Sequence, residues 1–214
     1  MENYEIIKIV ATILALSVAI IGHEIMHGWV AYKYGDNTAK EQGRLSINPL
    51  VHIDPIGSIA VPALLYFSGA PFLFGWAKPV PVYMPTVLRN GGTNGAVAVA
   101  LAGITYNLAL AGIFASILPM LLQPQSSVEA FFTFFIFQSI ILNVLLAIFN
   151  LIPVPPLDGA NAVRYLAMGW KLDRVVKFYD KIYPYGMIFI IIILATPIKD
   201  ILFSPISWII RFLI

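Results

Sequence analysis

Long stretches without a charged residue constrain this chain more than any other feature of its sequence. No charge occurs between Arg89 and Glu129, and none occurs from Ala130 to Leu157. Of the 214 residues 59% are hydrophobic and only 11% are charged, about half the charged fraction of an average soluble domain. A soluble fold of this size could not bury such runs, so the sequence predicts a membrane protein.

Four segments are apolar enough and long enough to cross a bilayer as helices. They cover residues 6–31, 96–122, 131–152 and 182–197. A fifth apolar segment, residues 55–77, is broken by prolines and glycines, which suits a loop that enters the membrane and returns on the same side. The expected fold class is an all-α polytopic membrane protein with about four transmembrane helices plus a re-entrant loop or short β segment near the cytoplasmic face. We expect residues 1–214 to form a single membrane-embedded domain.

The distribution of basic residues favours the re-entrant loop over a fifth crossing. If residues 55–77 return to the side from which they enter, and the N-terminus lies outside, ten of the thirteen Lys and Arg residues are cytoplasmic. A full crossing would divide them five against eight. The sequence therefore predicts a multi-pass protein of the cell membrane with an extracytoplasmic N-terminus. In this arrangement the first and third helices both end toward the cytoplasmic side.

Net charge and cysteine content exclude several kinds of function. The formal net charge of +2 is too small to indicate a nucleic-acid partner, so we expect none. The chain has no cysteine, which excludes disulfides and thiolate metal sites. Any metal site must therefore be built from His, Asp or Glu side chains.

The first apolar segment ends in "HEIMH", residues 23–27. His23 and His27 would lie one turn apart on a helix, so both imidazoles can reach a single ion. Glu24 would project beside them, where its carboxylate can contact the attacking water. This H-E-x-x-H spacing predicts two zinc ligands and a general base. The alternative is a helix end at headgroup level, but ionisable groups at membrane depth are costly and usually mark a functional site.

A catalytic zinc site needs a third protein ligand and an open position for water. The sequence "NLIPVPPLDG", residues 150–159, offers Asp158 just after the charge-free third helix. Prolines at membrane depth unwind a helix and leave its backbone groups able to meet a ligand or a peptide. Asp-Gly is also a common turn dipeptide, but the histidines at the same depth favour Asp158 as a ligand.

The combination of "HEIMH" in one apolar segment and "NLIPVPPLDG" in a later one resembles the site-2 protease family of intramembrane zinc metalloproteases. The stretches "GRLSINPLVHIDPIGS" and "FGWAKPVPV" also resemble its minimal prokaryotic branch, which lacks PDZ and CBS domains. The resemblance implies that His23, His27 and Asp158 bind Zn²⁺. It further implies that Glu24 activates water and that Asn150 lies near the substrate or the developing oxyanion.

One stretch departs from the family pattern. Relatives often have Ala-Gly-Pro followed after two residues by Asn, whereas "AGITYN", residues 102–107, has Ile104 in place of the proline. The change concerns helix packing or local backbone shape and not a metal ligand. Asn107 is kept, and we expect it to bind substrate or the oxyanion. Ala102 and Gly103 are expected to form a close helix contact.

The implied activity is hydrolysis of peptide bonds within or near transmembrane segments of single-span membrane proteins, in the lipid bilayer and with the active site toward the cytoplasm. A substrate helix must unwind first, because its peptide bonds are hydrogen-bonded and covered. The stretch "PFLFGWAKPVPV", residues 71–82, could hold it as an edge strand, or could only seal the site. Two other functions stay open: a membrane transporter that binds metal, and an inactive relative that binds membrane helices.

Three further polar residues have structural interpretations. His52 and Asp54 occur between two turn signals, Asn48-Pro49 and Asp54-Pro55, so a turn near the site is favoured over a second metal site. Asn143 lies within the third apolar segment, where an interhelical hydrogen bond is more common than a ligand role.

Overall fold

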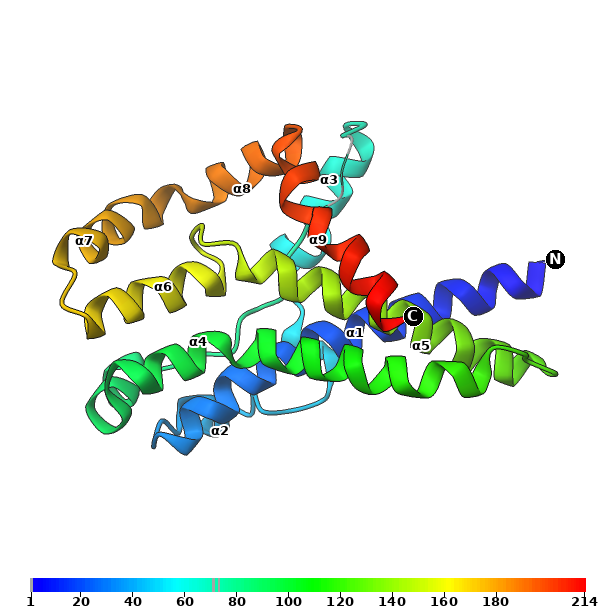
Figure 1. The fold of residues 1–214 in the computed structure, drawn as a ribbon, viewed down its shortest axis with the longest axis horizontal. Coiled ribbons are helices and arrows are strands. Elements are labelled where there is room, and N and C mark those ends of the chain that lie inside the picture. Colours follow the sequence, from blue (N-terminus) through cyan, green and yellow to red (C-terminus); the bar gives the residue numbers. More distant parts are fainter. Residues whose placement is uncertain (1, 71, 73) are drawn as a thin grey trace.

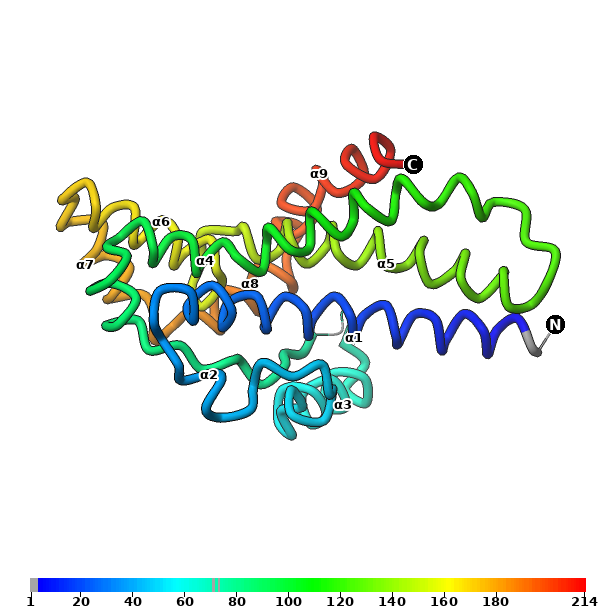
Figure 2. The backbone as a smooth tube through the Cα atoms, turned by 90° about the horizontal axis from the view of Figure 1, so that it is seen from below, coloured from blue at the N-terminus to red at the C-terminus, as the bar shows by residue number. Residues whose placement is uncertain are grey.

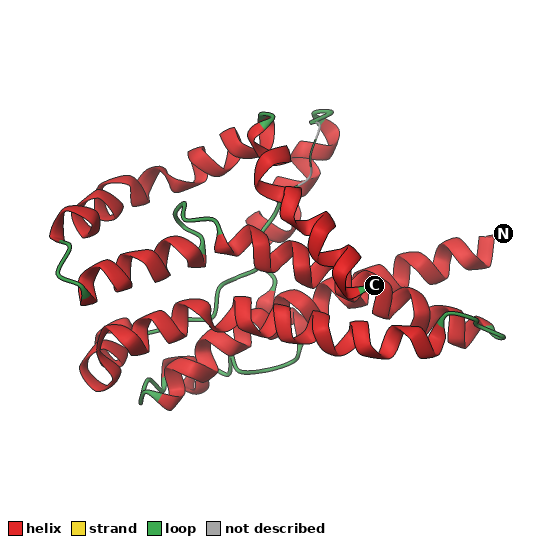
Figure 3. Ribbon diagram, in the orientation of Figure 1, coloured by secondary structure: helices red, strands yellow, loops and turns green. Residues whose placement is uncertain are grey.

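The computed structural model describes residues 2–70, 72 and 74–214. Within these residues every regular element is a helix and no strand occurs, which confirms the all-α prediction (Figure 3). The predicted short β segment is not seen in the described part of the chain. Residues 74–83, named the extended segment below, contain neither a helix nor a β ladder.

Three long helices form the centre of the molecule: α1 (Glu2–Lys33), α4 (Met84–Ile117) and α5 (Ser127–Leu151). Each of them packs against the other two (Figure 1). On α1, Ala11, Ala15 and Ala19 are spaced four apart and are fully buried. Because residues four apart share one face of a helix, these small side chains let the neighbouring helices approach closely.

Shorter helices connect and cover this bundle. They are α2 (Thr38–Glu41), η1 (Pro49–His52), η2 (Pro55–Ala60), α3 (Val61–Phe67), η3 (Leu118–Leu121), α6 (Asp158–Gly169), α7 (Asp173–Ile182), η4 (Tyr183–Tyr185), α8 (Gly186–Ala195) and α9 (Ile198–Leu213). Figure 2 shows α2 and α3 on one side of the bundle and α9 on the other. α6 packs against α4, and α9 packs against α5.

Four stretches of the described chain are helical, long and apolar enough to cross a membrane. They are Tyr4–Lys33, Met84–Leu121, Ser127–Leu151 and Asp173–Ala195. The prediction of about four transmembrane helices is thus confirmed by length and composition. The last stretch begins nine residues before the predicted residue 182, because α7 is amphipathic and its charged side chains interrupt the apolar pattern.

α4 also begins earlier than predicted. Its first turns contain Arg89 and a run of Gly and Asn residues, which is typical of a loop. The structure instead forms helix on both sides of a bend at Gly92, whose φ of 60° and ψ of −159° are not helical. Glycine reaches this conformation without the steric cost that a Cβ atom would impose.

The two ends of the fifth apolar segment, residues 55–77, lie side by side. Its first half forms η2 and α3, and the chain then comes back, so that the backbone N–H of Trp76 donates to the carbonyl of Gly57 at 3.1 Å. The hydroxyl of Ser58 donates to the carbonyl of Trp76 at 2.9 Å. These bonds fix the start of the extended segment beside the start of η2.

Candidate active site

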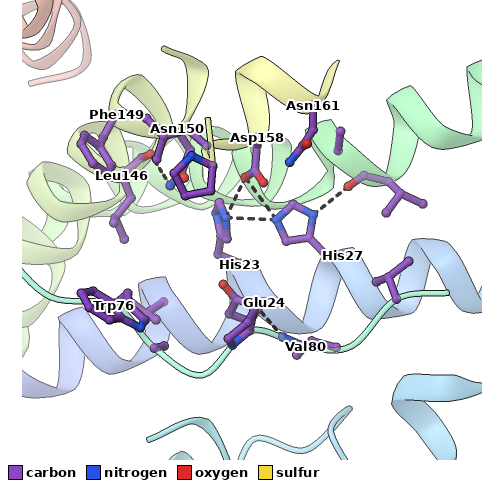
Figure 4. A pocket seen from close by; sticks show the side chains of 18 of the residues that line it. His23, Glu24, His27, Trp76, Val80, Leu146, Phe149, Asn150, Asp158 and Asn161 are labelled. Carbon is purple, nitrogen blue, oxygen red and sulfur yellow. Dashed lines mark hydrogen bonds and ion pairs between the residues drawn. The ribbon is translucent and has the colours of Figure 1, made fainter. Parts of the chain in front are cut away.

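Two helices bring the three predicted metal ligands together (Figure 4). His23 and His27 lie one turn apart in α1, and Asp158 is the first residue of α6. The Nε2 atoms of the histidines are 3.1 Å apart. Oδ2 of Asp158 lies 3.0 Å from Nε2 of His23 and 3.2 Å from Nε2 of His27. Among the described residues, no other group of three or more His, Asp and Glu side chains lies close enough together to share an ion.

The outer nitrogen of each imidazole determines which tautomer the ring adopts. Nδ1–H of His23 donates to Oδ1 of Asn107 at 2.6 Å, and Nδ1–H of His27 donates to the backbone carbonyl of Val99 at 2.7 Å. Because a carbonyl oxygen can only accept, the proton of each neutral ring is on Nδ1. Both Nε2 atoms therefore carry a lone pair, and they lie 3.0 and 3.2 Å from Oδ2 of Asp158.

The donor set fits a divalent cation. Three electron-pair donors lie 3.0 to 3.2 Å from one another with no proton to share, so they repel unless a cation lies among them. Zinc bonds of about 2.0–2.2 Å to nitrogen and oxygen are compatible with this spacing. Oδ2 of Asp158 is also buried without a hydrogen-bond donor, an arrangement that a metal ion would satisfy.

Glu24 is on the other side of the histidines from Asp158 in Figure 4. Its Oε2 accepts a hydrogen bond of 2.9 Å from the backbone N–H of Val80, which belongs to the extended segment. The carboxylate lines the same cavity as the three candidate ligands and is held beside them without being part of the cluster.

A cavity of about 760 Å³ opens beside the cluster, between α1, α4, α5, α6, the extended segment and the start of α8. Apolar and aromatic side chains form most of its wall, among them Phe74, Trp76, Leu146, Phe149, Met187 and Ile190. An apolar cavity with a few convergent polar groups is the usual form of a binding site.

Asn150 lines this cavity. Its side-chain nitrogen donates to the carbonyl of Leu146 one turn earlier at 3.0 Å. Asn107 is elsewhere: it is fully buried behind His23 and does not line the cavity. Its position suits the orientation of a ligand, and a contact with substrate or oxyanion does not fit the structure.

A buried polar network extends from His23 across all three central helices. Nδ2 of Asn107 donates to the carbonyl of Ala19 at 3.1 Å and to Oδ1 of Asn143 at 2.7 Å. Nδ2 of Asn143 in turn donates to the carbonyl of Ser139 at 2.7 Å. Asn143 thus makes the interhelical hydrogen bond that its place in an apolar segment predicts.

Gly103 allows the His23 ring to lie directly against α4. A Cβ atom at position 103 would be 2.5 Å from Nδ1, Cε1 and Nε2 of that ring, closer than any real Cβ contact. The predicted close helix contact is therefore present, and its partner is a candidate ligand. Ile104, the residue in place of the family's proline, is buried within unbroken helix.

His52 and Asp54 have the structural roles that the turn signals predict. The ring Nε2 of His52 donates to the carbonyl of Ser46 at 2.8 Å. Oδ1 of Asp54 accepts from the backbone N–H groups of Ile56 and Gly57 at the start of η2. Neither residue belongs to the metal-binding group.

Removing the acceptor behind His23 should weaken metal binding. We expect Asn107→Leu, which keeps the volume but cannot accept from Nδ1–H, to lower zinc affinity about 10- to 100-fold. Asn143→Leu should have a smaller effect, because it acts one hydrogen bond further away. Competition against a chromophoric chelator measures both, with Asn94→Leu on the exposed face of α4 as control. Equal affinity of Asn107→Leu and wild type would contradict this role.

Comparisons with known proteins agree with the geometry. A family model described as "Peptidase family M50" matches residues 11–194. Several relatives bear the name "Putative zinc metalloprotease". YwhC of Bacillus subtilis (strain 168) is 35% identical over 201 residues, which are 90% of this chain and 84% of YwhC. MJ0611 of Methanocaldococcus jannaschii is 31% identical over 172 residues, which are 79% of this chain and 78% of MJ0611.

Rip2 of Mycobacterium tuberculosis (strain ATCC 25618 / H37Rv) is 30% identical over 151 residues, which are 69% of this chain and 53% of Rip2. No solved structure matches the chain significantly. The family model covers most of the chain and includes all three candidate ligands and Glu24. The chain therefore belongs to peptidase family M50 and is a membrane-associated metalloprotease.

Proposed function

We propose that this protein is an intramembrane zinc endopeptidase that hydrolyses peptide bonds within or near transmembrane segments of single-span membrane proteins, in the manner of regulated intramembrane proteolysis. One observation carries the proposal: a His/His/Asp ligand set with an adjacent glutamate faces an apolar cavity between helices that could span a membrane. An apolar cavity at this place suits a substrate segment that comes from the bilayer.

Each polar group at the site has a distinct part in hydrolysis. His23, His27 and Asp158 would hold zinc, which when bound makes water more acidic and polarises a carbonyl group. Glu24 accepts the proton of the attacking water and returns it to the nitrogen of the leaving amine. Asn150, on the cavity wall, is in reach of the substrate backbone or the developing oxyanion.

The extended segment offers an unpaired edge to a substrate. On one side of this segment, Trp76 bonds through its N–H and its carbonyl to Gly57 and Ser58 of η2. The N–H of Lys78 donates to the carbonyl of His52 in η1. The backbone groups of Gly75 and Ala77 form no hydrogen bond with another described residue. Both residues line the cavity. An unwound substrate can therefore add to this edge as a strand.

Charge and the path of residues 55–77 both support an orientation with the N-terminus outside. The bonds that join Trp76 to Gly57 and Ser58 hold the ends of this segment together, which supports a loop that returns to the side it entered. With the N-terminus outside and such a loop, most basic residues and the ends of α1 and α5 would lie toward the cytoplasm. Substrates would then be cut near the cytoplasmic side of the bilayer.

Metal removal tests the function directly. Purified protein in liposomes should cut a single-span membrane protein inside or beside its transmembrane segment, and mass spectrometry of the products would locate the cut. A chelator should abolish cleavage, and one equivalent of zinc should restore it. If the protein binds zinc stoichiometrically yet cuts none of several unrelated single-span proteins, the proposal fails and a transport or helix-binding function gains support.

A further inference from the structure

Arg44 carries a buried charge, and no opposite charge lies beside it in the described part of the chain. Its side chain belongs to a residue that is only 7% exposed, and no carboxylate of the described chain lies within 4.0 Å of it. Nη2 donates to the carbonyls of Lys78 at 2.8 Å and Pro79 at 3.3 Å, while the buried Nε has no acceptor among the described residues. Burying an unpaired guanidinium is unfavourable for folding, so its presence here calls for an explanation.

A single peptide group connects Arg44 to Glu24. The carbonyl of Pro79 accepts from Arg44, and the N–H of Val80, in the same planar peptide unit, donates to Oε2 of Glu24 at 2.9 Å. The C=O and N–H of a trans peptide point in opposite directions, so the cation and the carboxylate lie on opposite sides of the segment. Each charge polarises the peptide in the sense that strengthens the other hydrogen bond.

The surrounding residues hold this peptide against α1. Gly28 lies one turn after Glu24, and a Cβ atom there would be 2.6 Å from Cγ1 of Val80. The missing side chain therefore lets Val80 approach the helix, and Val80 is buried. On the C-terminal side of the peptide, the N–H of Tyr83 donates to Oδ2 of Asp36 at 2.6 Å.

We propose that Arg44 is a positioning residue for hydrolysis, which acts through the Pro79–Val80 peptide to hold the carboxylate of Glu24 in place beside the metal ligands. This inference rests on the proposed function of the same site. The hydrogen bond from Val80 holds Oε2, which leaves the other oxygen of Glu24 for the attacking water. A general base contributes most when its geometry is fixed before the reaction begins.

Steady-state kinetics of Arg44 variants test the proposal. We expect Arg44→Met to lower kcat about 10- to 100-fold, since misplacement of a catalytic group by about 1 Å costs up to 10²-fold. KM for a single-span substrate and the bound zinc should not change. Arg44→Lys should recover most of the loss, because it keeps a charged donor. Arg89→Met, an exposed arginine of α4, serves as the matched control.

A second variant separates positioning from substrate binding. Ala77→Pro removes an N–H from the cavity edge and should raise KM with kcat retained, the opposite pattern to Arg44→Met. If Arg44→Met raises KM and leaves kcat unchanged, Arg44 serves the substrate and the inference is wrong. If Arg44→Met loses zinc or unfolds, Arg44→Lys and Arg44→Gln replace it in the test. The inference then requires kcat to fall from wild type to Arg44→Lys to Arg44→Gln at constant KM. Equal kcat values for the three proteins overturn it.

The outcome for the wild-type protein distinguishes this inference from the proposed function. A zinc-loaded wild type that cuts no membrane substrate contradicts the proposed function. If the wild type cuts and Arg44→Met cuts with the same kcat, only the role of Arg44 is contradicted.

Discussion

Glu24→Gln should leave zinc bound and nearly abolish hydrolysis. The amide keeps an oxygen that can accept from Val80 N–H, so the extended segment should stay in place, but it cannot take a proton from water. General acid–base catalysis contributes about 10²- to 10⁴-fold, so we expect a loss of kcat in that range. Metal analysis and cleavage of a single-span substrate, measured on the same preparation, check both parts of the prediction.

The wall of the cavity offers little that could replace Glu24. Among the described residues that line it, the other carboxylate is Asp158, which is occupied as a candidate ligand. Glu5→Gln is a suitable control, because Glu5 lies in the same helix but is exposed and paired with Lys8. If Glu24→Gln keeps activity within a few-fold of wild type, the base must be another group and the assignment of Glu24 is wrong.

The candidate metal ligands could be predicted from sequence because zinc chemistry restricts them strongly. With no cysteine in the chain, ligands had to be His, Asp or Glu, and few of these lie near apolar segments. The i, i+4 spacing of His23 and His27 is a property of one helix. Asp158 followed from its place at the end of another apolar segment. The structure brings all three within hydrogen-bonding distance of one another.

Helix positions could be predicted where the length of an apolar run is enough to define a helix. The first and third predicted spans agree with α1 and α5. The start of α4 was missed, because Arg89 and the glycines there resemble a loop while tertiary contacts keep them helical. A hydropathy pattern carries no information on such contacts, so it fails at helix ends first.

The environment of the ligands could not be read from the sequence. Whether Asn107 faces substrate or His23 depends on the rotation of α4 within the bundle, which the sequence pattern does not fix. The groups that hold His27 and Glu24 are the backbone carbonyl of Val99 and the backbone N–H of Val80, and any residue type could supply them. The hydrogen-bond partners of Arg44 could not be predicted from sequence either, because they are backbone carbonyls 34 and 35 residues away.

Gly103→Ala should disrupt the metal site although glycine 103 is not a ligand. The new Cβ would be 2.5 Å from three atoms of the His23 ring, and α4 cannot easily withdraw because Asn107, one turn later, is buried in hydrogen bonds to α1 and α5. The ring must then turn away from Asp158. We expect zinc affinity to fall about 100-fold or more, a larger effect than loss of the ring's hydrogen-bond acceptor alone.

Gly112→Ala is a closely matched control for this prediction. It lies in the same helix, and a Cβ atom there would meet nothing within 4 Å. Both substitutions stabilise the helix by about 1 kcal/mol through helix propensity. The contact with His23 is therefore the effect that distinguishes them. Zinc should raise the melting temperature of wild type and Gly112→Ala by similar amounts, and that of Gly103→Ala much less, because ligand stabilisation follows affinity. An equal rise in all three proteins would mean that His23 can bind zinc without the space that Gly103 provides.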